Sequence, residues 1–365
     1  MSYKILHTES SLGWGGQELR VIAETSGLIA RGFDCRIVCD PKSQFWQRST
    51  PDVFNSLISA RISRKTFIGL FAAREIIKRF KPDIISTHSS TDSWLFFIAN
   101  LTIILGPRAR LVRTRHVSAS VKNSFLNRRF YRLPDIVVTT SSDIRSSLIN
   151  TLDLPTERVI SVPTGIDVNY YLPKRSDVLD KSHVSLVMVS TLRSWKGHDF
   201  AIEAMKDLPD ATLTIVGDGP REIHLKKLVE NWGLTSRVFF AGYQKNVTEF
   251  LAKADIFLHP SYANEGVSQA LLQACSMAKI IIASNIGGLN EVVEHGKTGY
   301  LIDPASSREI VKAIESIMHD PRLWSERASK ARDVVAEKYS LDVMVDQMEV
   351  IYNQCIKGVG VEKHS

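Results

Sequence analysis

The sequence predicts an α/β protein of two domains, each containing a parallel sheet. Short apolar strand patterns alternate with helical patterns along the chain, first over 4–39 and again over 185–216. Polar or glycine-rich loops follow these strands. The chain has 365 residues, which is too long for one ordinary hydrophobic core. We therefore expect two α/β halves in succession.

The individual elements follow from apolar periodicity and from the turn residues between them. In the N-terminal half we expect strands over 4–8, 35–39, 82–88, 111–116, 136–140 and 159–162, and then a linker over 163–167. In the C-terminal half we expect strands over 185–190, 212–216, 238–241, 255–258 and 280–283, and a final helix over 341–356.

The composition is that of a globular protein, with 44% hydrophobic and 23% charged residues. The four cysteines form no disulfide framework, which fits a reducing cytosol. Lys4 is followed at once by a strand pattern instead of the apolar core of a signal peptide. The apolar run over 94–105 is broken by Asn100 and Thr102 and is too short to span a bilayer. We expect a buried helix there and a cytoplasmic protein.

Positive charge is concentrated in the N-terminal half. Residues 1–175 contain 25 Lys and Arg against 14 Asp and Glu, whereas residues 176–365 contain 21 against 25. Within this half, the segment 61–81 interleaves cationic with apolar side chains, as a helix on the inner face of an anionic membrane does. A helix with a solvated basic face is an equally good interpretation. The chain carries no signature of a nucleic-acid-binding module, so we expect no nucleic-acid partner.

A glycine-rich loop over 9–18 follows the first strand. Gly15 and Gly16, at the entrance of the next helix, would let the backbone approach an anion closely. The loop lacks the G-x-G-x-x-G pattern of dinucleotide-binding proteins, which argues against a redox cofactor. A tight turn without a ligand is the alternative.

Two strands of the N-terminal half end in histidine, at His88 and His116. Ligands of open α/β sheets bind beyond the carboxyl ends of the strands, so both are candidate site residues. His116 is the stronger candidate because Arg113, Arg115 and a polar loop surround it. A buried structural histidine remains the alternative, above all for His88.

Two loops of the C-terminal half contain candidate phosphate-binding groups. Arg193 and Lys196 follow the strand over 185–190. Arg can hold a phosphate through two hydrogen bonds, and Lys supplies a point charge. Gly217 opens a second loop, Gly217-Asp-Gly-Pro220, with the proline near the start of a helix.

The stretch 259–273 joins a strand to a helix. Glu265 lies in the turn, and Gln273 follows eight residues later, about two turns into a helix that begins near Gly266. Phosphate or sugar oxygens bind the unpaired donors of a helix N-terminus. Here those donors would be the backbone N–H groups of Gly266, Val267, Ser268 and Gln269. An ordinary strand–turn–helix, with Glu265 stabilised by the helix dipole, is the alternative.

Several motifs follow one another in a recognisable order: Gly15-Gly16 with Glu18, His116, Pro163-x-Gly165-Ile-Asp167, Arg193-x-x-Lys196-Gly197, Gly217-Asp-Gly-Pro220, Glu265 with its partner eight residues on, and Gly287-Gly288 with Glu291. The series resembles the family 4 retaining glycosyltransferases of the GT-B fold over nearly the whole chain. The resemblance implies two Rossmann-like domains facing each other across a cleft. Residues 1–165 would bind the acceptor, with a C-terminal helix over about 340–365 packing back on them, and residues 166–339 would bind a nucleotide-diphosphate sugar.

The resemblance also assigns roles to residues. Arg193 and Lys196 would hold the donor diphosphate, and Glu265 the donor sugar. The catalytic residues implied are His116, Arg193, Lys196 and Glu265. Gly16 would approach the donor phosphate. Together with the loop and helix-start residues named above, the donor-binding residues expected are Gly15, Gly16, Gly217, Gly266, Val267, Ser268, Gln269 and Gln273. From their place at the strand ends, His88, Arg113 and Arg115 are expected on the acceptor side.

The chain departs from the family pattern at Gln273, where the family has a second acid that bonds the ribose hydroxyls. Gln keeps an acceptor oxygen and adds a donor but loses the charge. Because a hydrogen bond to a charged group is stronger than a neutral one by about 1 kcal/mol, we expect weaker or altered donor binding and retained activity.

The expected reaction is transfer of a hexosyl group from a UDP- or GDP-linked sugar to an acceptor hydroxyl with retained configuration. The chain contains no D-x-D motif, so we expect neither a metal nor another cofactor. The basic N-terminal half suits a lipid-linked or phosphorylated glycan at the inner membrane face, such as a lipopolysaccharide or surface-polysaccharide precursor. A sugar-nucleotide epimerase and a non-catalytic sugar-nucleotide-binding protein remain alternatives.

Overall fold

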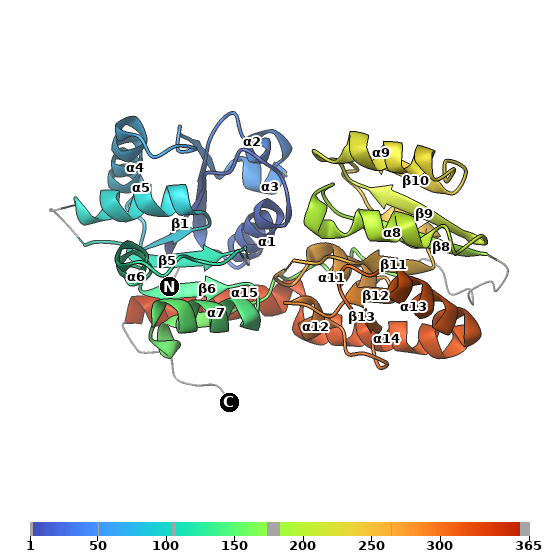
Figure 1. The fold of residues 1–365 in the computed structure, drawn as a ribbon. Coiled ribbons are helices and arrows are strands. Elements are labelled where there is room, and N and C mark those ends of the chain that lie inside the picture. Colours follow the sequence, from blue (N-terminus) through green and yellow to red (C-terminus); the bar gives the residue numbers. More distant parts are fainter. Residues whose placement is uncertain are drawn as a thin grey trace. The chain divides into compact units, whose positions relative to one another are not determined.

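The structure is a computed structural model that describes residues 3–49, 51–103, 107–117, 119–173, 183–263 and 265–357. The chain forms two compact units (Figure 1). The first contains residues 1–165 and 341–365, and the second contains residues 166–340. The part of the expected C-terminal helix beyond residue 357 lies outside the described residues.

Within its described residues, the first unit has a seven-stranded sheet in the order β3-β2-β1-β4-β5-β6-β7, paired in parallel. The strands are β1 (Lys4–Glu9), β2 (Asp34–Cys39), β3 (Leu57–Ser59), β4 (Ile84–Thr87), β5 (Arg110–Arg115), β6 (Ile136–Thr139) and β7 (Val159–Ser161). All strands expected in this half are present. The sequence did not predict β3, because its three residues are too few to show a period.

Helices cover both faces of this sheet (Figure 1). They are α1 (Gly16–Ala30), α2 (Gln44–Arg48), α3 (Pro51–Phe54), α4 (Phe67–Phe80), α5 (Ser90–Leu101), α6 (Phe125–Tyr131), α7 (Ser142–Leu152) and α15 (Leu341–Lys357). One core, which includes Phe97 and Leu148, lies under α4 to α7. The other lies under α1 and α15, where Tyr352 donates a 2.6 Å hydrogen bond to Glu24. The last helix therefore packs within the first unit.

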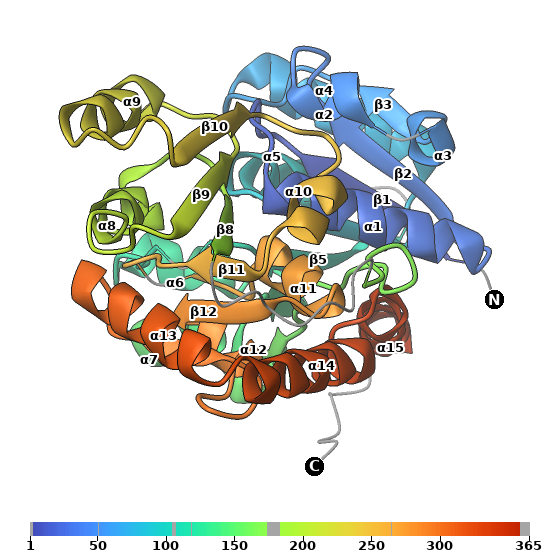
Figure 2. The same ribbon diagram turned by 90° about the vertical axis from the view of Figure 1, so that its right-hand side faces the viewer.

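The second unit, in its described part, has a six-stranded parallel sheet in the order β10-β9-β8-β11-β12-β13. The strands are β8 (Val184–Val189), β9 (Ala211–Val216), β10 (Val238–Gly242), β11 (Ile256–His259), β12 (Ile280–Ser284) and β13 (Tyr300–Ile302). The helices are α8 (His198–Ala204), α9 (Glu222–Asn231), α10 (Thr248–Lys253), α11 (Gln269–Ser276), α12 (Leu289–Val292), α13 (Ser307–His319) and α14 (Pro321–Lys338). The cores place α8, α9 and α13 on one face, and α10, α11 and α12 on the other (Figure 2).

Each sheet has a reversal point, at which successive strands stop being added on one side of the first strand and begin to be added on its other side. In the first unit the chain builds β1, β2 and β3 outward and then returns to β4, beside β1. In the second unit it builds β8, β9 and β10 and then returns to β11, beside β8. In open α/β sheets, ligands bind beyond the carboxyl ends of the strands at such a point. His88 follows β4, and Glu265 follows β11, so both lie beside such a point.

Among the described residues, none of the helices has both the length and the hydropathy that a bilayer-spanning helix requires. The expected buried helix over 94–105 is α5, which starts earlier, at Ser90, and buries Phe96 and Phe97. Residues 104–106 lie outside the described part of the chain.

Candidate functional site

The second unit joins Lys196, Glu265 and His259 at its reversal point. Lys196 follows β8, and Glu265 follows β11, in the neighbouring strand of the sheet. The Lys196 Nζ lies 2.8 Å from the Glu265 Oε1. His259, the last residue of β11, bonds the other carboxylate oxygen through its Nε2 at 3.1 Å. Both carboxylate oxygens are therefore engaged, and the Glu265 side chain is only 10% exposed.

Glycines make this approach of the loops possible. Gly197 has φ +74°, and a Cβ there would overlap the carbonyl oxygen of Pro260, in the loop that follows β11. A Cβ on Gly288 would lie 2.5 Å from the backbone nitrogen of Val267. The Gly288 N–H donates a 2.6 Å hydrogen bond to the Glu265 carbonyl oxygen. The loop after β8 thus packs on the backbone at Pro260, and the loop after β12 packs on the backbone at Glu265.

The electrostatics of the cluster favour an ionised Glu265. Burial by itself would raise the pKa of this carboxyl, but Lys196 and the hydrogen bond from His259 outweigh it, and the pKa lies well below its usual range. His198, which starts α8, is buried and bonds Ser190 at 3.0 Å. Burial, and then the charge on Lys196, lower the pKa of His198 to about 4.

The helix after Glu265 starts later than expected. α11 begins at Gln269, with Ser268 as its N-cap, so Gly266, Val267 and Ser268 precede the helix and are not its first-turn donors. The expectation of a start near Gly266 was wrong because the loop first packs back on Gly288, with the Val267 side chain buried.

Gln273 consequently lies in the second turn of α11, closer to its start than expected. Its Nε2 donates a 2.9 Å hydrogen bond to the hydroxyl oxygen of Tyr171. Burial raises the pKa of Tyr171 to about 12, so this hydroxyl stays neutral. An amide can donate to the tyrosine oxygen, whereas a carboxylate at this position could only accept from it.

The other expected donor residues lie in separate surroundings. Arg193 is exposed, and its guanidinium lies 5.2 Å from the ring centre of Trp195. Gly217, with φ +137°, brings the loop after β9 against the backbone of Ser190. Pro220 lies two residues before α9, which begins at Glu222, so the proline is near the start of a helix as expected.

In the first unit, His88 and His116 lie side by side, and a third histidine joins them. The His88 Nδ1 lies 3.1 Å from the His116 Nε2, and the His88 Nε2 lies 3.1 Å from the Nδ1 of His7, on β1. Burial lowers the pKa of all three imidazoles. The sheet order explains the cluster, because β1, β4 and β5 are neighbours.

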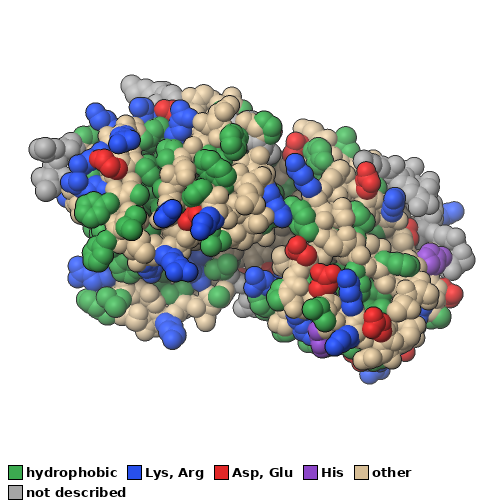
Figure 3. Space-filling model, turned by 90° about the horizontal axis from the view of Figure 1, so that it is seen from above, with side chains coloured by type: hydrophobic (Ala, Val, Ile, Leu, Met, Phe, Trp, Pro, Cys, Tyr) green, Lys and Arg blue, Asp and Glu red, His purple; other side chains and the backbone are tan. Residues whose placement is uncertain are grey.

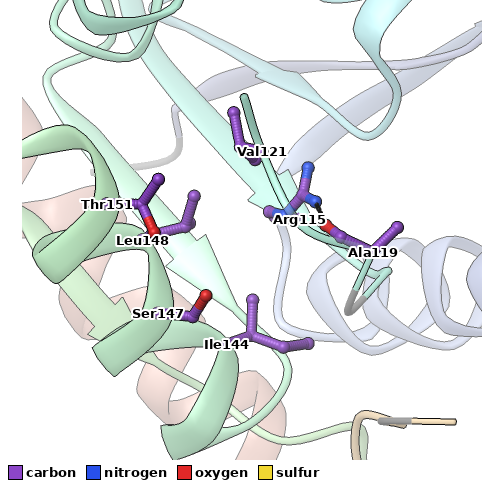
Figure 4. A pocket seen from close by; sticks show the side chains of 7 residues that line it. All are labelled: Arg115, Ala119, Val121, Ile144, Ser147, Leu148 and Thr151. Carbon is purple, nitrogen blue, oxygen red and sulfur yellow. Dashed lines mark hydrogen bonds between the residues drawn. The ribbon is translucent and has the colours of Figure 1, made fainter. Parts of the chain in front are cut away.

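Arg113 and Arg115 face α6. Arg113 is buried, with its guanidinium 4.1 Å from the ring centre of Tyr131, and it donates to the Ser90 Oγ at 3.2 Å. Arg115 donates to the Tyr131 hydroxyl at 2.9 Å. Arg115 also lines a hollow with Ala119 and residues of α7 such as Leu148 (Figure 4). At about 10 Å³ this hollow holds no more than one water molecule and cannot admit a sugar.

Gly15 and Gly16 stand at the N-terminus of α1, beyond the end of β1. A Cβ on Gly16 would meet no atom within 4 Å, so the first unit itself does not require glycine there. Two buried carboxyls, Glu9 and Asp92, lie near the same strand end. Burial raises the pKa of both, and for Glu9 the neighbouring Asp92 raises it further.

Sequence reasoning did not single out His7, His259 or Tyr171. His259 ends a strand, as His88 and His116 nearly do, and the same rule could have identified it. His7 lies inside an apolar strand, and Tyr171 is far from Gln273 in sequence, so neither carried a local signal.

Comparisons with known proteins match both units. Residues 174–334 match the family model described as glycosyl transferases group 1, and residues 14–170 match the model of glycosyltransferase family 4. Together the two matches extend over most of the chain.

Individual proteins show the same likeness. N-acetyl-alpha-D-glucosaminyl L-malate synthase of Bacillus anthracis is 28% identical over 298 residues, which are 78% of this chain and 77% of that protein. GDP-mannose-dependent alpha-(1-6)-phosphatidylinositol monomannoside mannosyltransferase of Mycobacterium tuberculosis is 27% identical over 296 residues, 73% of this chain and 76% of the relative. The crystal structure of Anabaena HepE in complex with UDP-glucose has a TM-score of 0.83 at 22% identity and covers 96% of this chain and 100% of that one.

Proposed function

Since the chain belongs to the family 4 glycosyltransferases of the GT-B fold, we propose that it transfers a hexosyl group to an acceptor hydroxyl with retention of the anomeric configuration. The family and the α/β GT-B fold class expected from the sequence are confirmed. The donor is a nucleotide sugar. HepE was crystallised with UDP-glucose and the mycobacterial relative is GDP-mannose-dependent, so we propose a UDP- or GDP-linked sugar.

The observation that carries this proposal is the Lys196–Glu265 ion pair at the reversal point of the second sheet. An ammonium held at a fixed position can stabilise the charge that develops on a departing diphosphate, the largest single term in many enzymes. Glu265 is ionised and anchored, so it can accept hydrogen bonds from the hydroxyls of a donor sugar. Arg193 is exposed and can turn from Trp195 to a phosphate.

A retained configuration can arise from two successive attacks or from attack on the face from which the diphosphate leaves, and two buried carboxyls near the end of β1, Glu9 and Asp92, favour the second course. A double displacement needs an ionised carboxylate as nucleophile. Glu9 accepts hydrogen bonds from the Ser11 N–H and the Gln17 side chain, and its raised pKa favours the neutral form. Asp92 caps α5 through Ser89. Attack on the face from which the diphosphate leaves, with His116 orienting a substrate oxygen, therefore fits these residues better.

The acceptor that we propose is a lipid-linked or phosphorylated glycan, such as a lipopolysaccharide or surface-polysaccharide precursor, at the inner face of the membrane. The N-terminal ends of α4 and α6 expose five large apolar side chains, here called the α4–α6 rim. Its members and their exposed fractions are Phe67 83%, Ile68 71%, Phe71 69%, Phe125 71% and Leu126 68%. Side chains of this size are costly to leave in water and can enter the outer part of a bilayer.

The rim lies at the carboxyl edge of the first sheet, because α4 follows β3 and α6 follows β5. The rings of Trp94 in α5 and Phe130 in α6 stack with their centres 4.2 Å apart, and the Lys65 ammonium lies 5.2 Å from the Trp94 ring centre. Trp94 therefore connects the segment before α4 with α6. Exposed cations flank the rim: Arg61, Arg64, Lys65, Lys122 and Arg129. Figure 3 shows hydrophobic and cationic side chains intermixed on this unit. Of the two interpretations of segment 61–81, these exposures favour the membrane surface over a merely solvated basic face.

Cosedimentation with vesicles tests the membrane contact. At low salt the protein should bind phosphatidylglycerol vesicles and not phosphatidylcholine vesicles. Phe67→Ser and Phe125→Ser should each weaken binding by about tenfold, the effect of losing one inserted aromatic side chain. Phe239→Ser, at an exposed phenylalanine of the second unit, is the matched control and should bind like wild type. Equal binding by all variants would contradict the rim's role.

Thermal unfolding with UDP, GDP, ADP and CMP, with and without their sugars, tests the donor site. A ligand at 100 times its dissociation constant stabilises by about 2.7 kcal/mol, which a melting curve resolves. One nucleoside diphosphate should stabilise wild type but not Lys196→Ala. Lys312→Ala removes a more exposed Lys–Glu pair on α13, away from the candidate site, and should retain the stabilisation. No stabilisation by any nucleotide, or conversion of the donor alone into an epimer, would contradict the transferase proposal.

We also propose that turnover needs no divalent metal, because the chain lacks the D-x-D motif through which carboxylates commonly hold a metal against a diphosphate. Transfer should proceed at an unchanged rate in excess EDTA. Loss of turnover that one added metal restores would contradict this, and an inverted anomeric centre in the product, seen by NMR, would contradict retention.

A further inference from the structure

Three histidine side chains of the first unit form a continuous chain of hydrogen bonds, His7 to His88 to His116. Each link joins an Nδ1 of one ring to an Nε2 of the next at 3.1 Å. The rings of His7 and His88 stack with centres 5.4 Å apart, and those of His88 and His116 lie 5.3 Å apart. His7 and His88 are buried, whereas His116 is half-buried at the outer end.

A neutral imidazole has one N–H and one lone pair, and each link needs one of each. Only two arrangements satisfy both links. In the outward arrangement, His7 Nδ1–H donates to His88, His88 Nδ1–H donates to His116, and the N–H of His116 is on its Nδ1. In the inward arrangement every donor is reversed, and the N–H of His7 is on its Nε2.

The inner end decides between them. The Nε2 of His7 is buried and has no hydrogen-bond partner among the residues that the structure describes. The inward arrangement would leave a buried N–H without an acceptor there, which proteins rarely tolerate, whereas the outward one leaves only a lone pair. We infer that the chain is polarised outward, so that His88 is a positioning residue that holds His116 as a hydrogen-bond donor through its Nδ1–H.

This inference deepens the proposed transfer reaction and rests on it for its catalytic meaning. A donor at His116 orients an oxygen of the acceptor or of the sugar, and it cannot serve as the base that takes the acceptor's proton. The charged and titratable groups nearest the chain are Arg20 and Glu24 of α1, Tyr352 of α15, and Asp92 of α5.

Long-range ¹H–¹⁵N NMR of histidine-labelled enzyme reads the tautomer directly, without any substrate. His116, identified by the signal lost in His116→Asn, should carry its proton on Nδ1 in wild type. In His88→Leu it should change to the Nε2–H form that free histidine prefers. His224→Leu, at an exposed histidine of α9, should leave the His116 signals unchanged.

An Nε2–H tautomer of His116 in wild type, or an unchanged Nδ1–H in His88→Leu, would overturn the inference. If His88→Leu does not fold, His7→Asp is the second variant. Its carboxylate accepts at the inner end and should reverse the donors of the histidine chain, so that His116 carries its proton on Nε2. An unchanged Nδ1–H tautomer of His116 in this variant would also overturn the inference. In a transfer assay His88→Leu should lower kcat roughly tenfold, the effect of misdirecting one hydrogen bond, with little change in KM. Absence of any transfer by wild type would count against the proposed function and leave the NMR result standing.

Discussion

Removing either partner of the Lys196–Glu265 pair should cost the second unit stability, but by unequal amounts. Lys196→Met leaves a carboxylate that is 10% exposed without its cation, and we expect a loss of about 3 kcal/mol, the lower end for buried pairs. Glu265→Gln leaves an ammonium that is 18% exposed and can reach water, so we expect about 1 kcal/mol. The double variant leaves no charge and should lose about 2 kcal/mol, a coupling energy of about 2 kcal/mol between the two residues.

Urea unfolding at pH 7 measures these differences as shifts of the midpoint at constant m. Because the two units need not unfold together, hydrogen exchange in peptides of β11 and β12 should assign the loss to the second unit. Lys312→Met is the matched control. Its pair with Glu309 is exposed on α13, and its loss should change stability by less than about 0.5 kcal/mol. A coupling energy below about 0.5 kcal/mol would refute the reasoning, because the two charges would then not stabilise one another.

Three further variants test other contacts. Gly197→Ala should destabilise the protein by about 2 kcal/mol more than Gly296→Ala. Both glycines have a positive φ near 73°, but only a Cβ on Gly197 would overlap a neighbouring loop, at Pro260. Equal melting temperatures of the two variants would contradict this close approach. Burial holds the pKa of His198 near 4, below the 6.5 of the unfolded chain, so the unfolded state binds a proton first as the pH falls. Wild type should therefore lose up to about 3 kcal/mol of stability relative to His198→Gln between pH 6.5 and pH 4. Parallel stability profiles for wild type and His198→Gln would argue against this, as would the same profile difference between wild type and a control variant of an exposed histidine, His224→Gln. Gln273→Glu restores the family's acid and should tighten nucleotide binding about fivefold by calorimetry, whereas unchanged or weaker binding would show that the tyrosine contact of Gln273 matters more.

The strands of this protein could be predicted because parallel buried strands are continuous apolar runs bounded by turn residues. β8, β11 and β12 are present within one residue of their expected bounds. β3 and β13 were missed because three-residue strands are defined by their neighbours in the sheet and not by a pattern of their own.

The start of α11 shows where local signals end. No residue between Glu265 and Gln269 breaks a helix, and Gly266 is equally compatible with a turn and with the start of a helix. The decisive contact is with Gly288, in a loop from another strand. A tertiary contact of this kind overrides a weak local preference.

The sequence by itself determined which residue types follow each strand, and therefore that Lys196, Glu265, His88 and His116 are candidates. It could not decide how those side chains are paired. The ion pair of Lys196 with Glu265 depends on the order β8-β11, and the histidine chain depends on the order β1-β4-β5. Strand order is a property of long-range packing, because hydrogen bonds between strands are the same for any neighbour and only the burial of both sheet faces selects the arrangement. For that reason the chemistry at each strand end was visible in the chain, and the contacts between those ends were decided by the tertiary structure.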